Sequence, residues 1–176
     1  MEPSFSIPPE ISFEQAIALT EDLLADQSLT EAGLESAIAA LVQTANGARG
    51  FFVTFLTGDY SLADQPTAAV LQGLRSAPAP VADLLTKNLA MGTAMEITHR
   101  RSQTPDLAAG SARVQRRSQQ LIQLLQLPAL QASLQQLLTS VTSTEGAYQS
   151  FLSRWGYDAE QRQAIQQAIA TVSGPE

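Results

Sequence analysis

The sequence contains no cysteine and only one histidine, His99. Without cysteine the chain cannot form disulfides, zinc–thiolate sites or iron–sulfur clusters, and it has no thiol nucleophile. A Ser-His-Asp triad would have to use His99, but no Gly-x-Ser-x-Gly turn is present to carry the serine. These shortages argue against several common classes of enzyme and metalloprotein.

Phosphate-binding loops are missing as well. The only lysine, Lys87, follows a threonine rather than a glycine, so the chain has no Walker motif. Asp59 and Asp64 lack the alternating oxygen ligands and the central glycine of a calcium-binding EF-hand. We therefore expect neither nucleotide binding through a Walker loop nor calcium binding of the EF-hand type.

Long apolar runs are also absent. The best candidate, Phe51–Leu56, is six residues long, whereas a helix that spans a membrane needs about 20 apolar residues. The segment Met1–Phe5 lacks the basic stretch and apolar run of a secretory signal. The sequence therefore predicts a cytoplasmic protein with no membrane span.

Charge is scarce, and helix-forming residues are abundant. Charged residues make up 15% of the 176-residue chain, below the usual value of about a quarter. Hydrophobic residues make up 44%, and a chain of this length buries roughly 70% of its unfolded surface. A core therefore forms without disulfides or a structural metal. Alanine, leucine and glutamine supply much of the remainder, and all three favour helix.

Apolar residues recur at helical spacing along most of the chain, as Leu34, Ile38 and Leu41 illustrate. This pattern predicts an all-α fold, a compact bundle of about eight helices. Residues 1–11 contain three prolines and are predicted to be an extended N-terminal arm. Residues 12–176 are predicted to form a single all-helical domain.

The predicted helix ends have local chemical signals. Ser12 is a predicted N-cap with Gln15 as its capping-box partner, and Asp158 is the predicted N-cap of the last helix. Pro105 stands where a proline opens a helix, and Gly156 stands where a glycine ends one. These signals divide the chain into short, well-delimited helices.

Three segments are less regular. The sequence of 51–56 is β-branched and aromatic enough for a buried strand, but no partner strand is visible, so we expect a buried helix. Residues 58–65 are predicted to be a loop. Residues 77–80, Ala-Pro-Ala-Pro, are predicted to be a stiff linker that turns a corner rather than separating two domains.

Glu96 and His99 stand three positions apart, which places them on one face of a helix. Carboxylate-bridged di-iron bundles use such Glu-x-x-His pairs, but they need two pairs and two further glutamates. This chain supplies half a site, which only a symmetric dimer would complete. We therefore predict no metal and no cofactor, and we interpret His99 as a hydrogen-bonded residue near a helix end.

A line of residues on the inward face of the same helix marks a candidate pocket. Because glycine costs about 1 kcal/mol relative to alanine inside a helix, we expect another group to approach Gly92 closely. A neighbouring helix is the first interpretation. The alternative is a small-molecule pocket between helices, lined by Asn88, Met95, Glu96 and His99.

Basic residues are concentrated between positions 99 and 117, where five arginines accompany a single acid, Asp106. They are Arg100, Arg101, Arg113, Arg116 and Arg117. If the two helices that carry them form a hairpin, all five are expected to converge on one exposed face. Guanidinium groups suit bidentate contact with carboxylates, so this face predicts a protein partner with an acidic surface.

Two other interpretations of the arginines stay open. The first is a solvated face without a partner. The second is ion pairing with the N-terminal helices of the same chain, because the first 48 residues contain eight acids and no basic residue. Nucleic acid is disfavoured, because the formal net charge is −7 and no nucleic-acid-reading motif accompanies the arginines.

Three stretches together resemble a known group of proteins: 50–59 (Gly-Phe-Phe-Val-Thr-Phe-Leu-Thr-Gly-Asp), 87–91 (Lys-Asn-Leu-Ala-Met) and 154–158 (Arg-Trp-Gly-Tyr-Asp). The chain resembles a family of small, uncharacterised, all-helical cyanobacterial proteins over most of its length after residue 30. The resemblance implies a cyanobacterial cytosol. It implies no activity or cofactor and transfers no functional residue.

The function is therefore unknown from the sequence, and the interpretation that fits best is a non-enzymatic helical module for protein interaction or assembly through the arginine-rich face. A weakly charged, glutamine-rich exterior also permits a homodimer. The alternative is a small-molecule binding protein with the pocket near Asn88 and His99.

Overall fold

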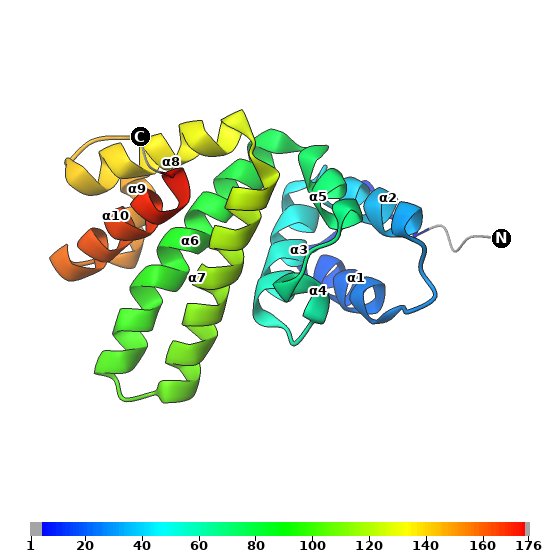
Figure 1. Cartoon of the computed structure of the whole chain (residues 1–176), viewed down its shortest axis with the longest axis horizontal. Coiled ribbons are helices and arrows are strands. Elements are labelled where there is room, and N and C mark those ends of the chain that lie inside the picture. The colour runs from blue at the N-terminus through cyan, green and yellow to red at the C-terminus, as the bar shows by residue number, and fades with distance from the viewer. Residues whose placement is uncertain (1–4, 175–176) are drawn as a thin grey trace. The chain divides into compact units, whose positions relative to one another are not determined.

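A computed structural model describes residues 5–174, which form helices joined by short connections and no strand (Figure 1). The predicted all-α fold is therefore confirmed. The described residues form ten helices rather than about eight. One unexpected helix, α4 (Ser61–Asp64), is a single turn inside the predicted loop 58–65. No described helix combines the length and apolar character needed to cross a membrane.

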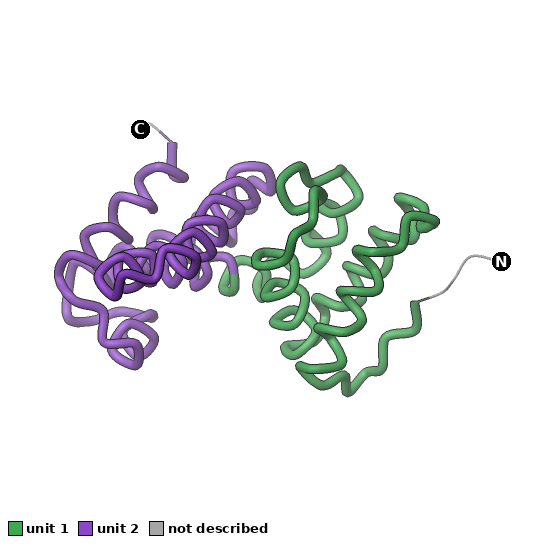
Figure 2. Tube along the Cα trace, turned by 90° about the horizontal axis from the view of Figure 1, so that it is seen from below, with its two compact units in different colours: residues 1–84 green, residues 85–176 purple. Residues whose placement is uncertain are grey.

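The chain divides into two compact units, residues 1–84 and 85–176, which are coloured separately in Figure 2. The division falls inside α6 (Pro78–Arg101) rather than at the prolines. The prediction of a stiff linker at 77–80 is wrong, because Pro78 and Pro80 lie in the first turn of α6. Prolines are tolerated there, since the first N–H groups of a helix have no intrahelical acceptor.

Unit 1 holds the first five helices: α1 (Phe13–Ala25), α2 (Glu31–Leu41), α3 (Ala45–Thr57), α4 and α5 (Ala68–Arg75). In this unit α3 packs on α1, and α2 packs on α5. Phe51 and Phe55 are fully buried with their rings stacked at 5.1 Å, and Phe52 meets Phe51 edge-on. The prediction that 51–56 is a buried helix is confirmed.

Unit 2 holds most of α6 together with α7 (Pro105–Leu125), α8 (Pro128–Thr142), α9 (Gln149–Trp155) and α10 (Ala159–Ser173). Helices α6 and α7 form an antiparallel hairpin (Figure 1). They are closest at Gly92, where an added Cβ would lie 2.9 Å from the backbone nitrogen of Gln115. Helix α10 packs on α8 and α7, and α9 packs on α8.

The helix-end signals at Ser12, Asp158 and Gly156 are confirmed. Ser12 and Gln15 form a reciprocal capping box at α1, and Asp158 and Gln161 form another at α10. Gly156 ends α9 in the left-handed conformation with φ +63°. Residues 5–11 of the predicted N-terminal arm contain no helix, and residues 1–4 of that arm lie outside the described residues.

Candidate functional site

The five arginines do not form one exposed face. Arg117 is only 2% exposed, so the prediction that it is displayed to solvent is wrong. Arg100 forms an ion pair with Glu96 on its own helix. Arg101 forms ion pairs with Asp158, at 2.7 Å, and with Glu160. Arg113 is half-buried, and Arg116 is exposed.

The error has a geometric cause in the orientation of α7. The helical spacing of apolar residues on α7, among them Leu107 and Leu121, predicts an apolar stripe with the arginines opposite it. Leu121 is fully buried, but Leu107, in the first turn, is 55% exposed. Arg117 stands one turn before Leu121 and therefore lies on the same buried face, not opposite it. A buried guanidinium needs partners inside the protein, and Arg117 is not without a partner.

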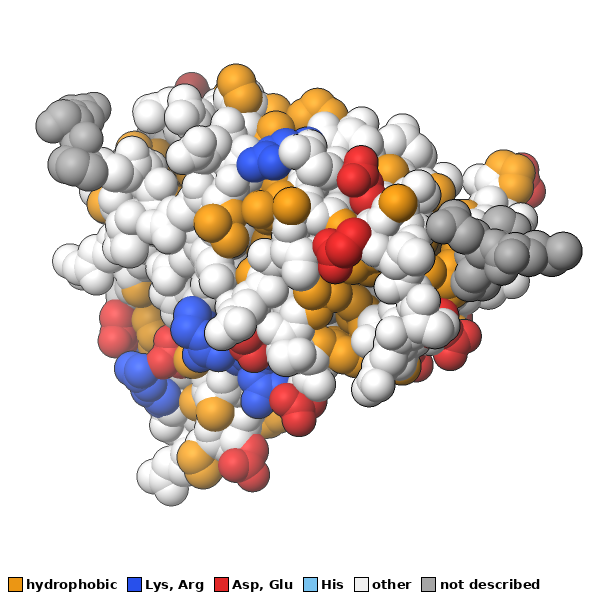
Figure 3. Space-filling view, turned by 45° about the vertical axis from the view of Figure 1, so that its right-hand side comes forward, with side chains coloured by type: hydrophobic (Ala, Val, Ile, Leu, Met, Phe, Trp, Pro, Cys, Tyr) orange, Lys and Arg blue, Asp and Glu red, His pale blue; other side chains and the backbone are white. Residues whose placement is uncertain are grey.

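Basic and acidic side chains lie next to one another on the face drawn in Figure 3. Among the described residues in that view, no extended area carries basic side chains alone. Arg100 and Arg101 already pair with acids of this chain, with which an acidic partner would have to compete. The arginine-rich face is thus a weaker candidate for an interface than the sequence suggested.

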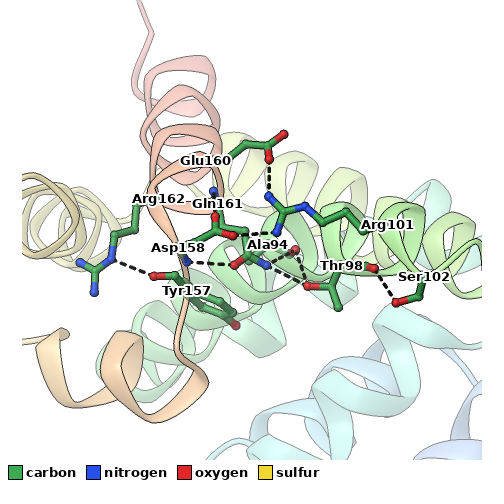
Figure 4. Close-up of polar contacts among 9 residues, drawn as sticks. All are labelled: Ala94, Thr98, Arg101, Ser102, Tyr157, Asp158, Glu160, Gln161 and Arg162. Carbon is green, nitrogen blue, oxygen red and sulfur yellow. Dashed lines mark hydrogen bonds and ion pairs between the residues drawn. The ribbon is translucent and has the colours of Figure 1, made fainter.

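The charged residues instead help to form a polar junction between the C-terminal part of α6 and the first turn of α10 (Figure 4). Gln161, which is 5% exposed, is at its centre. Its Oε1 accepts from the backbone N–H of Asp158 at 3.0 Å. Its Nε2 donates to the carbonyl oxygen of Ala94 at 2.9 Å and to Oγ1 of Thr98 at 2.8 Å. Both N–H groups and the carbonyl oxygen of this amide therefore have hydrogen-bond partners inside the protein.

The ion pairs of the junction stabilise the charged forms of their groups. The hydrogen bond from Arg101 lowers the pKa of Asp158 below its usual value, and the backbone N–H of Gln161 lowers it further. The same contacts with Asp158 and Glu160 raise the pKa of Arg101. Both side chains are about half exposed, so the ion pair that they form lies at the surface.

The residues of the predicted pocket, Asn88, Met95, Glu96 and His99, all lie on α6. Glu96 is held by Arg100, and within residues 5–174 no three carboxylate or imidazole side chains are placed to hold a metal ion. Position 92 faces the backbone of α7, which confirms that a neighbouring helix approaches Gly92. Asn88, Met95 and His99 are half-buried.

A small polar groove of about 470 Å³ lies between α6, α7 and α10. Its charged lining residues are Glu96, Arg100 and Glu160, and its other lining residues include several glutamines and threonines. Glu96 is thus the one residue of the predicted pocket that lines this groove. Asn88, Met95 and His99 do not line it.

A larger groove, of about 1020 Å³, lies between α7, α8 and α10. The buried side chains of Leu130 and Leu134 lie at its base. Half-buried Leu127 and Leu138 add apolar surface that remains open to solvent. The lining also contains five exposed glutamines, Gln123, Gln126, Gln131, Gln135 and Gln166. We call this feature the glutamine groove; none of its described lining residues is charged.

Sequence reasoning missed the glutamine groove, although it noted the abundance of glutamine. The groove is assembled from three helices that are separated along the chain, and their packing decides which glutamines line it. One local signal was present on α8: the leucines and glutamines of the lining recur every three or four positions from 127 to 138, so they share one helix face.

Comparison with known proteins confirms that the chain has relatives in an uncharacterised family, whereas the cyanobacterial origin stays a prediction. A family model described as "Uncharacterised conserved protein UCP020893" matches residues 12–172. The match includes all three stretches that carried the resemblance. Neither a curated protein nor a solved structure matches the chain.

Proposed function

Because the chain belongs to the uncharacterised conserved protein family UCP020893, whose description names no activity, we propose a function from its surfaces. The protein acts as a non-enzymatic helical module for protein interaction or assembly, and its contact surface is the glutamine groove. This proposal keeps the class of function expected from the sequence but moves the contact surface away from the arginines.

One observation carries the proposal: the glutamine groove combines open apolar surface with amide groups and contains no charged side chain among its described lining residues. Burial of apolar surface contributes about 25 cal/mol per Å², so Leu127 and Leu138 provide binding free energy. The glutamine amides at the rim both donate and accept hydrogen bonds. Apolar grooves between helices are a common docking place for protein segments.

Site-specific photocrosslinking in the source cell tests this proposal. Gln135, which lines the groove, is replaced by the photoreactive amino acid p-benzoylphenylalanine, and the crosslinked products are identified by mass spectrometry. The matched control places the same group at Gln136, an exposed neighbour on α8 that does not line the groove. We expect protein adducts from position 135 and few from 136. Equal labelling at the two positions, or none at 135, would contradict the proposal.

A second candidate function, the binding of a small polar molecule, is favoured by the polar groove between α6, α7 and α10. Its volume, about 470 Å³, lies within the range of about 300–1,000 Å³ typical of ligand pockets. Arg100 and Glu96 form an ion pair in its wall, and a zwitterion such as an amino acid would bind there by exchanging partners with the two side chains. A thermal-shift screen with amino acids tests this candidate: a rise in melting temperature that Glu96→Gln removes supports it, and no rise rejects it.

A further inference from the structure

We infer that the occupant of the glutamine groove is a second copy of this chain, bound about a two-fold axis with the α8 helices of the two copies facing one another. The inference rests on the proposed function, because it takes the glutamine groove to be the contact surface. It identifies the partner and the arrangement. Three observations carry it.

The first observation is the charge of the chain. Two copies with a formal net charge of −7 each repel one another, most strongly where their acidic residues approach. The glutamine groove has no charged side chain among its described lining residues. It is therefore a surface where two like-charged copies meet at little electrostatic cost, and it offers no charge complement to an acidic or basic partner.

The second observation is the chemistry of the rim. In a two-fold interface the same surface patch is used by both copies, so each side chain near the axis meets its own kind. A carboxylate or guanidinium placed there would face a like charge. A glutamine amide has donors and an acceptor and is therefore complementary to another glutamine. Gln131 and Gln135 on α8 are exposed lining residues of this type.

The third observation is the pattern on α8. The open apolar surface comes from Leu127 and Leu138, which lie at the start of α8 and near its end. Gln131 and Gln135 lie between them on the same face. A helix with apolar side chains and neutral polar groups along one face packs well against an identical helix, because ridges of one enter grooves of the other. Helix α8 is thus the element that we place next to the two-fold axis.

The test measures the mass of the purified full-length chain by sedimentation equilibrium. The wild-type protein is expected to have a molecular mass of twice 18.8 kDa when its concentration is raised to about 100 μM, because dimer formation increases with concentration. The double variant Gln131→Glu with Gln135→Glu places like charges across the axis and is expected to weaken association by about 100-fold or more. The control Ala132→Glu with Gln136→Glu, which adds the same two charges at exposed positions of α8 outside the groove, is expected to remain dimeric. Circular dichroism checks that all variants stay helical.

A charge-swap mixture separates a second copy from any other cause of weakened association. The double variant Gln131→Lys with Gln135→Lys is expected to be monomeric alone and to pair with the Glu variant when the two are mixed. Recovery of a mixed dimer supports the inference. A monomeric wild type, a dimer that the Glu variant leaves intact, or a mixture that fails to pair would overturn it.

Failure of this inference is distinguishable from failure of the proposed function. If the wild type is monomeric while position 135 crosslinks to a different protein and position 136 does not, the two-fold dimer is rejected and the contact surface stands. If position 135 yields no protein adduct and the chain is monomeric, both are rejected.

Discussion

The side-chain amide of Gln161 donates a hydrogen bond to the backbone carbonyl oxygen of Ala94 at 2.9 Å, although the two residues are 67 positions apart. This contact joins the first turn of α10 to α6. The same amide closes the capping box with Asp158. One neutral side chain thus fixes both the start of a helix and its attachment to another.

Replacement of Gln161 by alanine is expected to lower the free energy of unfolding by about 1–3 kcal/mol. The variant loses the reciprocal half of the capping box and leaves the buried carbonyl of Ala94 with one partner fewer. Urea denaturation followed by circular dichroism measures the change. The matched control is Gln163→Ala on the same helix, an exposed position where we expect a change within about 0.5 kcal/mol. Equal effects of the two variants would contradict the role assigned to Gln161.

Asp158 is expected to make stability depend on pH in the acidic range. Its pKa is lowered in the folded chain by the hydrogen bond from Arg101. Folding therefore gains from the ionised carboxylate above the unfolded pKa of about 3.9, and this gain is lost as the pH falls through the lower, folded pKa. The comparison variant is Asp158→Asn, because asparagine is also a good N-cap but does not titrate.

The measurement is the urea midpoint of wild type and Asp158→Asn from about pH 7 to about pH 2. We expect wild type to be the more stable at neutral pH and the difference to disappear at the acid end. Added salt is expected to reduce the neutral-pH difference, since the ion pair with Arg101 is exposed and screened. A difference that stays constant with pH would argue that the carboxylate acts only as a cap.

Two glycines inside helices of unit 2 are expected to respond in opposite ways to alanine. At Gly92 an added Cβ would lie 2.9 Å from the backbone nitrogen of Gln115 and 3.1 Å from the carbonyl oxygen of Ser111. Backbone atoms cannot move aside cheaply, so α6 and α7 must separate, and we expect Gly92→Ala to destabilise the protein by about 1–3 kcal/mol. At Gly110 nothing lies within 4 Å of the added Cβ.

Gly110→Ala is therefore expected to stabilise the protein by up to about 1 kcal/mol, the difference in helix propensity between the two residues. Thermal melting of both variants beside wild type provides the measurement. If both substitutions raise the melting temperature, the close approach of α6 and α7 at Gly92 is wrong.

The parts of the fold that could be predicted from the sequence are those set by local chemistry. Ser12 and Asp158 were recognisable as caps because capping depends on residues three positions away, and Gly156 was recognisable because few other residues adopt positive φ. The helical nature of 51–56 followed from the absence of a partner strand. Pro78 and Pro80 were misread because proline is typical of linkers and of first helical turns alike.

The parts that could not be predicted depend on which helix packs against which. Leu107 has the spacing of a core residue but lies in the first turn of α7, where it is 55% exposed. Arg117 is among the most polar residues of that helix, yet it is 2% exposed. Their positions are decided by neighbouring helices and not by periodicity. The glutamine groove escaped prediction for the same reason, since three separate helices form it.

The N–H groups and the carbonyl oxygen of the Gln161 side chain all have hydrogen-bond partners. Helix α10 is attached to α6 by this amide at its first turn, whereas Gln166, Ile169 and Val172 further along the helix line the glutamine groove. A shift of α10 on occupation of the groove would tilt the helix about its attached end and stretch the bond to Ala94. We therefore expect the NMR resonances of the Gln161 side-chain NH₂ group to shift when the glutamine groove is occupied.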